Sequence, residues 1–193
     1  MGKDLAHYRS RCCHGMGYTR MLADYAGISS EATYYVPDGC AYEVWALRGQ
    51  GQRAYTYFAE NAPAAQNDRA EVRHLEPYCY GQFTEGPASK HFGRSQVHWL
   101  TGTASTVMVG CVEGILGLRP DLDGLRLAPA IPREWTGFTM DKDFRGCRLH
   151  IRVENPHHRE SGFTSLTVNG RELPDAYIPA ALLTRETEVC LIL

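Results

Sequence analysis

The sequence has no long hydrophobic run and no excess of basic charge. No apolar stretch approaches about 18 residues, the length of a membrane-spanning helix, and no basic segment followed by an apolar one opens the chain. These absences predict neither a membrane span nor a signal peptide. The 20 Lys and Arg against 22 Asp and Glu give a formal net charge of -2, and the basic residues are scattered. We therefore expect no nucleic-acid partner.

Metal-binding and disulfide patterns are also missing. Seven cysteines is an odd number without a C-x-x-C pair, which favours reduced thiols in the cytoplasm. The adjacent Cys12 and Cys13 do not have the spacing of zinc ligands, and residues 121–124 are too few for a calcium loop and indicate a turn. His157 and His158 are interpreted as a loop pair. We expect no metal and no cofactor.

What the chain does have is a change of periodicity near Gly117. Before it, apolar spacing predicts helices over 41–47, 52–60 and 103–116, with a turn at 49–52. After it, Leu149, Ile151 and Val153 alternate with polar residues, which predicts a half-buried strand. Further strands are expected on either side of a type I′ turn at Asn169-Gly170, and over 188–193. Strands without intervening helices favour an antiparallel β-sandwich.

Two stretches combine aromatic and polar residues. Residues 76–87, which end in Gly-Pro, indicate a loop, and residues 99–106 end in hydroxyl side chains where an apolar helix begins. Val107, Cys111 and Ile115 recur at four-residue spacing on that helix, with Met108 beside them. A helix start offers unpaired N–H groups and suits an anion. The alternative is that Thr101 or Thr103 is only an N-cap.

These stretches resemble the cellobiose phosphorylase family, inverting glycoside phosphorylases of glycoside hydrolase family 94. The resemblance is strong over 63–169 and looser from residue 41 to the C-terminus. Residues 83–86 and 97–98 look more like the cellodextrin or laminaribiose branch. The segments that carry the family resemblance are 75–82, 86–87, 92–93, 99–104, 115–127, 130–135, 144–146 and 166–170.

The resemblance implies a catalytic (α/α)6 barrel followed by a C-terminal β domain. Twelve helices of about 11 residues with loops of about 4–6 need about 200 residues, and only 116 precede Gly117. We therefore expect an α + β chain. Residues 1–116 would be the C-terminal helices of a partial barrel, and residues 117–193 would be an antiparallel β-sandwich. Family members are often homodimers, so a homodimer is expected of a full-length enzyme.

The resemblance also assigns residues. Family members bind phosphate through a glutamine and a Thr-Gly pair, which correspond to Gln82, Thr101 and Gly102 here. The family's general acid is an aspartate in an upstream barrel loop, and no segment resembles that loop, so no catalytic residue is assigned. A family histidine that contacts phosphate would fall near Val36, and residues 11–35 resemble nothing in the family.

Other side chains have competing interpretations. Trp99 is a candidate for stacking on a sugar ring, with a core position as the alternative. His98 either lines the acceptor side or is exposed polar surface, and Gln82 without the resemblance would be a loop amide. Glu76 and Glu85 are candidate acids, although Glu76 before Pro77 is better explained as ordering a loop.

The function expected from the resemblance is phosphorolysis of β-glucosidic di- or oligosaccharides of the cellobiose or cellodextrin type. The partners would be a sugar and inorganic phosphate as co-substrate, giving an α-sugar 1-phosphate. Without the general acid, this chain alone is expected to be inactive. The alternative functions are a non-catalytic remnant, a carbohydrate-contacting β-sandwich, or a lectin-like module.

Overall fold

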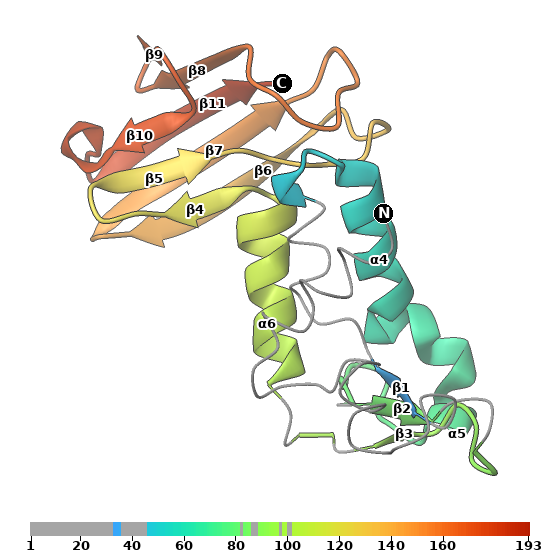
Figure 1. The fold of residues 1–193 in the computed structure, drawn as a ribbon. Helices are drawn as coiled ribbons and strands as arrows, with labels where there is room; N and C mark the ends of the chain where they lie inside the picture. Colours follow the sequence, from blue (N-terminus) through green and yellow to red (C-terminus); the bar gives the residue numbers. More distant parts are fainter. Residues whose placement is uncertain (1–32, 36–45, 82, 86–88, 97, 100–101) are drawn as a thin grey trace. The chain divides into compact units, whose positions relative to one another are not determined.

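The computed structural model describes residues 33–35, 46–81, 83–85, 89–96, 98–99 and 102–193. The chain divides into two compact units (Figure 1). Unit 1 comprises residues 1–42 and 56–110, and unit 2 comprises residues 43–55 and 111–193. The predicted domain boundary near residue 117 stays a prediction.

Unit 2 contains two β-sheets that lie face to face (Figure 1). The smaller sheet has the order β10-β5-β4, and the larger has the order β6-β7-β11-β8-β9. Their strands are β4 Leu118–Pro120, β5 Gly124–Leu127, β6 Gly137–Phe144, β7 Cys147–Glu154, β8 Ser165–Val168, β9 Arg171–Leu173, β10 Tyr177–Pro179 and β11 Glu186–Ile192, and a 3-10 turn, η3 Ala180–Leu182, follows β10.

The core of unit 2 follows from strand alternation. Leu149, Ile151 and Val153 on β7 are at most 2% exposed, while the residues between them face outward. Leu125 and Ile178 supply the opposite layer and are equally buried. The predicted strand at 148–154 is confirmed. The predicted hairpin is confirmed as well, since Val168 pairs with Arg171 and both Asn169 and Gly170 have positive φ.

Two details of the sheet prediction need correction. β11 pairs parallel with β7 and antiparallel with β8, so the larger sheet is mixed and not purely antiparallel. The connection from β7 to β11 passes through β8, β9 and β10, which is long enough to return the chain in the same direction. The terminal strand begins at Glu186, two residues before its predicted start.

The start of helix α4 Gly51–Asn61 belongs to unit 2. Ser161 Oγ donates to Gly49 O at 3.2 Å, and Tyr55 meets Trp135 edge to face at a centroid distance of 5.2 Å. The predicted helix over 52–60 is confirmed, but the predicted turn is too long because Gly51 and Gln52 are already helical. The predicted helix over 41–47 is described only at residues 46 and 47, which are helical.

Unit 1 holds a small antiparallel sheet and short helices. Besides the second half of α4, its described elements are β1 Thr33–Tyr35, η1 Pro63–Arg69, α5 Ala70–Arg73, β2 Phe83–Glu85, β3 Ser95–Gln96 and α6 Thr103–Val109. The sheet order is β1-β2-β3, so the segment predicted to be a loop contains a short strand. The mixture of helices and sheets confirms the predicted α + β class. The partial (α/α)6 barrel stays a prediction.

The predicted helix over 103–116 is present, but it changes character halfway. After α6, residues Gly110–Ile115 (η2) form a π-helical segment. Although residues 1–116 are expected to be only part of a barrel, the apolar side chains of Val107 and Ile115 are 5% and 4% exposed, so this face of the helix is buried. Met108 and Val109, at 65% and 44% exposure, are apolar side chains of this helix that face solvent. Burial raises the pKa of the Cys111 thiol to about 11. In the described ranges, no helix is long and apolar enough to cross a membrane.

Candidate functional site

The loop after α5 places the first candidate residues. His74 ends α5 in the left-handed conformation, and Leu75 and Cys79 anchor the loop by being 6% exposed. The Cys79 N–H donates to Glu76 O at 3.0 Å, which closes a turn over Pro77. A Cβ on Gly81 would lie 3.1 Å from both Leu75 Cδ1 and Ser95 Cβ, so the chain runs close to β3 just before residue 82.

Glu85 on β2 has a full set of partners. Gln96 Nε2 donates to Glu85 Oε1 at 2.7 Å, and Ser89 Oγ donates to Oε2. These two hydrogen bonds, that of Ser89 foremost, hold the pKa of the Glu85 carboxyl below its usual range. A general acid must carry a proton near neutral pH. Glu85 therefore joins β2 to its surroundings, and its lowered pKa disfavours it as a general acid.

Trp99, Glu76 and Tyr78 form an exposed cluster. Trp99 is 66% exposed and Tyr78 71%, with ring centroids 6.2 Å apart in an edge-to-face arrangement. The Trp99 indole N–H donates to Glu76 Oε1 at 3.2 Å. Trp99 also has φ of +64°, an uncommon conformation for a bulky residue. The alternative of Trp99 as a core residue is wrong, because its ring lies at the surface.

The Glu76 carboxylate in this cluster is only partly satisfied. Its Oε2 is closed off from solvent and has no hydrogen-bond partner within the described part of the chain. The pKa of Glu76 is lowered, first by its own backbone N–H, then by the Trp99 indole, with a smaller contribution from the charge of the exposed His98. The exposed Trp99 ring, held in place by the Glu76 carboxylate, suits a sugar, which offers an apolar face to an aromatic ring.

Gly102 forms the start of helix α6. It is the N-cap residue and offers no side chain to the first helical amides. Ser105 Oγ and Thr106 Oγ1 both donate to Gly102 O, at 2.8 and 3.2 Å. Thr103 is the first helical residue and is 4% exposed, so the alternative that Thr103 is the N-cap is wrong. Gln82 and Thr101 lie outside the described residues.

The sequence patterns did not indicate the Glu76–Trp99 hydrogen bond. The two residues are 23 positions apart, and nothing in their spacing predicts a contact. The positive φ that brings Trp99 to the surface also has no sequence signal, because Gly and Asn are the residues usually found there. Among the described side chains, no group of three or more His, Cys, Asp or Glu is arranged to hold a metal.

Comparison with known proteins gives two adjoining family matches. Residues 16–117 match the catalytic domain of the Glycosyl hydrolase 94 superfamily, and residues 118–172 match the C-terminal domain of Glycosyl hydrolase family 65. The two matches meet at Gly117, where the helical periodicity of the sequence stops.

Curated relatives carry phosphorylase names. The chain is 37% identical over 170 residues to N,N'-diacetylchitobiose phosphorylase of Vibrio furnissii, covering 88% of this chain and 21% of that protein. It is 35% identical over 158 residues to the protein of the same name from Vibrio proteolyticus, with coverages of 81% and 20%. Solabiose phosphorylase of Paenibacillus borealis is 26% identical over 133 residues, with coverages of 69% and 17%.

The chain thus spans about a fifth of the length of these relatives. The resemblance inferred from the sequence motifs is confirmed. The matched residues 16–117 are more than half of the 193 residues of the chain. The chain therefore belongs to the Glycosyl hydrolase 94 superfamily.

Proposed function

We propose that this chain supplies the phosphate-binding and sugar-contacting part of an inverting glycoside phosphorylase. Such an enzyme transfers a glycosyl group from a β-linked di- or oligosaccharide to inorganic phosphate. The observation that carries the proposal is the hydrogen-bonded pair of Trp99 and Glu76, in which Trp99 lies three residues before Gly102, the N-cap of α6. The cluster offers the exposed ring of Trp99 to a sugar, and the helix start offers amides to an anion.

In this proposal each residue has a defined role. Thr101 donates its hydroxyl to a phosphate oxygen, Gln82 donates its amide, and Gly102 allows the backbone to approach the anion. Trp99 stacks on the sugar, and His98 lines the acceptor side. Phosphate takes the place of the water used by an inverting hydrolase, so a single carboxylic acid is needed to protonate the leaving oxygen.

The substrate in this proposal is a β-linked di- or oligosaccharide of the cellobiose, cellodextrin or chitobiose type. In this proposal the acid comes from the upstream barrel loop that the family resemblance implies, and the lowered pKa values of Glu76 and Glu85 make either of these a poor general acid. The rival interpretation is a non-catalytic remnant. The two interpretations make different predictions for a fusion that supplies the upstream part of the barrel. Only in the enzyme interpretation do Thr101 and Gln82 affect the phosphate kinetics of that fusion.

The test uses a fusion of this chain to the upstream part of a related phosphorylase. Thr101→Val keeps the shape of the side chain and removes the hydroxyl. Loss of one hydrogen bond to an anion costs about 1.5–3 kcal/mol, or roughly 10- to 150-fold in transition-state binding. We expect Thr101→Val to lower kcat/KM for phosphate by that factor, measured as release of sugar 1-phosphate.

Two matched variants sharpen this test. Thr101→Ser keeps the hydroxyl and should have a smaller effect, and Arg152→Gln on the outer face of β7 should have none. The same order of effects is expected with arsenate as nucleophile, because it has the same oxyanion geometry. Unchanged phosphate kinetics in Thr101→Val would reduce Thr101 to a structural residue and favour the remnant interpretation.

A further inference from the structure

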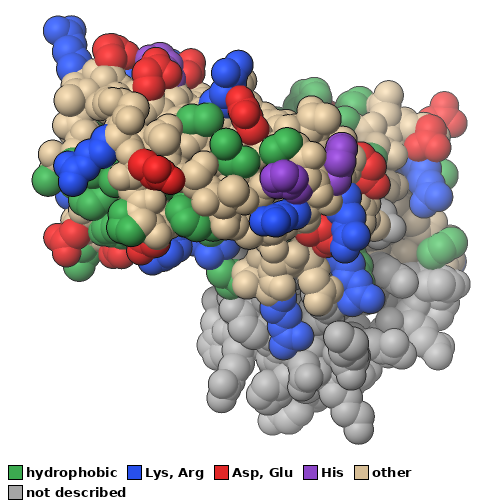
Figure 2. All heavy atoms as spheres, turned by 90° about the horizontal axis from the view of Figure 1, so that it is seen from above, with side chains coloured by type: hydrophobic (Ala, Val, Ile, Leu, Met, Phe, Trp, Pro, Cys, Tyr) green, Lys and Arg blue, Asp and Glu red, His purple; other side chains and the backbone are tan. Residues whose placement is uncertain are grey.

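A second polar site lies in unit 2, away from the residues discussed above. A pocket of about 510 Å³ is lined by Gly49, Gln50, Arg133 and residues 157–161. All of these belong to unit 2. The volume falls within the range of small-molecule pockets, about 300–1,000 Å³. Histidine and basic side chains gather on part of the face shown in Figure 2.

The walls of this pocket are fixed by hydrogen bonds. Asn155 is fully buried, and its Nδ2 donates to Trp135 O at 3.0 Å and to Arg159 O at 2.8 Å. Its Oδ1 accepts from the Arg159 N–H at 2.8 Å. The opposite wall is equally constrained, since a Cβ on Gly49 would lie 2.4 Å from Ser161 Oγ. The pocket is therefore formed before any ligand arrives.

The acidic residue in the pocket is already neutralised. Glu160 Oε1 accepts from Arg133 Nε at 2.9 Å, and its Oε2 accepts from the Gln52 N–H at 3.2 Å, at the start of α4. Its side chain is 21% exposed. Both oxygens are thus committed to protein donors. Glu160 orients the Arg133 guanidinium and caps the helix. The pocket therefore contains no unpaired Glu160 carboxylate that would repel an anion.

The donors in the pocket outnumber this one acid. Arg133 is 71% exposed, and its two terminal nitrogens have no hydrogen bond within the described residues. Arg159 uses one nitrogen on Thr164 Oγ1 at 3.3 Å. His158 Nδ1 lies 2.9 Å from Arg133 O, and because a carbonyl only accepts, Nδ1 carries the hydrogen. His157 adds a second exposed imidazole. Arg133 and Arg159 thus both line the pocket, and guanidinium groups are the donors best suited to the oxygens of a phosphate.

The size and polarity of the pocket narrow the ligand further. A space of about 510 Å³ is much larger than a phosphate ion, and no Phe, Tyr or Trp lines it to stack on a base. Gln50 and Ser161 offer amide and hydroxyl groups instead. We infer that this pocket binds a phosphate ester of a polyhydroxylated compound, with the phosphate on Arg133 and Arg159. The inference does not depend on the proposed phosphorylase function.

The experiment is a titration of the ¹⁵N-labelled 193-residue chain with glucose 1-phosphate, followed by NMR. We expect saturable shifts of the amides of residues 49–50 and 157–161. Glucose and inorganic phosphate are titrated separately. Glucose should cause no saturable shift, and phosphate should bind at least several-fold more weakly than the ester. If phosphate binds as tightly as the ester, the hydroxyl part of the inference is overturned. If glucose alone reproduces the shifts, the anion part is overturned.

Variants connect the binding to the two arginines. Arg133→Gln with Arg159→Gln should weaken glucose 1-phosphate binding about tenfold or more, since charge-assisted hydrogen bonds are lost. Arg152→Gln, an exposed arginine outside the pocket, is the matched control and should bind as the parent does. Because Arg133 also orients Glu160, Arg133→Lys is tested as well, and it should keep part of the affinity in a chain with an unchanged spectrum elsewhere. Unchanged binding in the double variant, or no saturable shift in the parent, would overturn the inference.

Discussion

Asn155 is the side chain on which the loop after β7 depends. It is fully buried and makes three hydrogen bonds to the backbone of Trp135 and Arg159. Each bond contributes about 0.5–1.5 kcal/mol, and buried groups left without partners cost about 1–3 kcal/mol. We predict that Asn155→Ala lowers the free energy of unfolding of the chain by about 2–4 kcal/mol, measured by urea denaturation with circular dichroism.

Glu172→Ala provides the control for that measurement. Glu172 is an exposed residue on β9, and its removal should change the free energy of unfolding by about 0.5 kcal/mol or less. If Asn155→Ala is as mild as Glu172→Ala, the loop is held by other contacts and the three hydrogen bonds are not its main support.

For single residues, the sequence indicates which side chains belong to the candidate site better than it indicates where those side chains lie in the fold. The motif that contains Trp99 was visible in the sequence, but its exposure was not, because a bulky apolar residue before a helix is usually buried. Glu76 was assigned to a loop-ordering role, and its turn to Cys79 agrees with that. Its hydrogen bond to Trp99 needed the three-dimensional structure, since residues so far apart meet only through tertiary folding.

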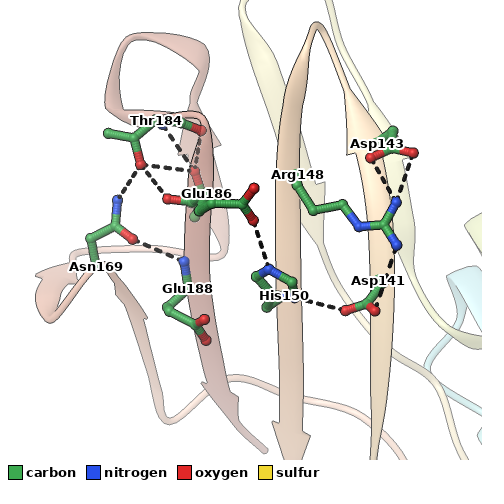
Figure 3. Close-up of polar contacts among 9 residues, drawn as sticks. Asp141, Asp143, Arg148, His150, Asn169, Thr184, Glu186 and Glu188 are labelled. Carbon is green, nitrogen blue, oxygen red and sulfur yellow. Dashed lines mark hydrogen bonds and ion pairs between the residues drawn. The ribbon is translucent and has the colours of Figure 1, made fainter.

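At the scale of elements, the outer face of the larger sheet carries a polar ladder across β6, β7 and β11 (Figure 3). Arg148 on β7 donates to both carboxylate oxygens of Asp143 on β6, at 2.9 and 2.8 Å. Next to it, His150 lies between Asp141 and Glu186, with ring nitrogens 2.9 Å from each carboxylate. Cross-strand pairs of opposite charge are a recurrent way to stabilise a sheet.

His150 makes the stability of this sheet depend on pH. The pKa of His150 is raised, first by its hydrogen bond to Glu186 and then by that to Asp141, with further contributions from the charges of Asp141 and Glu188. A folded-state pKa above the unfolded value of about 6.5 stabilises the chain fully below that pH. The contribution is lost as the pH rises through the folded pKa. We predict that His150→Gln destabilises the chain more at pH 6 than at pH 8.5, measured by urea denaturation at both pH values.

A second background tests the cause of this dependence. In a chain that already carries Asp141→Asn and Glu186→Gln, the effect of His150→Gln should no longer differ between the two pH values. If the difference persists there, the partners of His150 are not the source of its raised pKa.

The elements differ in how well their patterns predict them. β7 was predictable because its apolar residues alternate and face the core on one side only. β6 pairs with β7 along its whole length but has no such pattern, since its residues range from half-buried to exposed. The parallel pairing of β11 with β7 depends on long-range topology, which a local period of two does not encode.

At the scale of the whole molecule, the chain spans about a fifth of its phosphorylase relatives. Hydrogen bonds lower the pKa values of Glu76 and Glu85, which makes both poor general acids, and positioned acid catalysis is worth about 10²–10⁴-fold. We predict that the purified chain releases no sugar 1-phosphate from cellobiose, cellodextrins, laminaribiose or chitobiose with phosphate. A fusion that restores the upstream barrel is the positive control. Release above a blank by the chain alone would contradict this prediction.

Resistance to proteolysis is the second property of the whole molecule that we predict. The sheets of unit 2 bury a continuous set of side chains, many below 2% exposure, whereas Met108, Tyr78 and Trp99 of unit 1 are largely exposed. We expect residues 117–193 to survive limited trypsin digestion longer than residues 1–60. Mass spectrometry of the fragments over time measures this difference. Equal protection of both regions in a monomer would mean that the helical part is self-supporting.

The position of β11 sets the order in which the larger sheet is completed. β11 lies between β7 and β8, so the hairpin β6–β7 and the hairpin β8–β9 are joined only through it. On a ribosome, both hairpins are synthesised first, and each keeps an unpaired edge until residues 186–192 emerge. Unpaired edges recruit other strands. Until β11 inserts, the free edges of β7 and β8 are therefore the places where a strand of a neighbouring copy can pair in its stead.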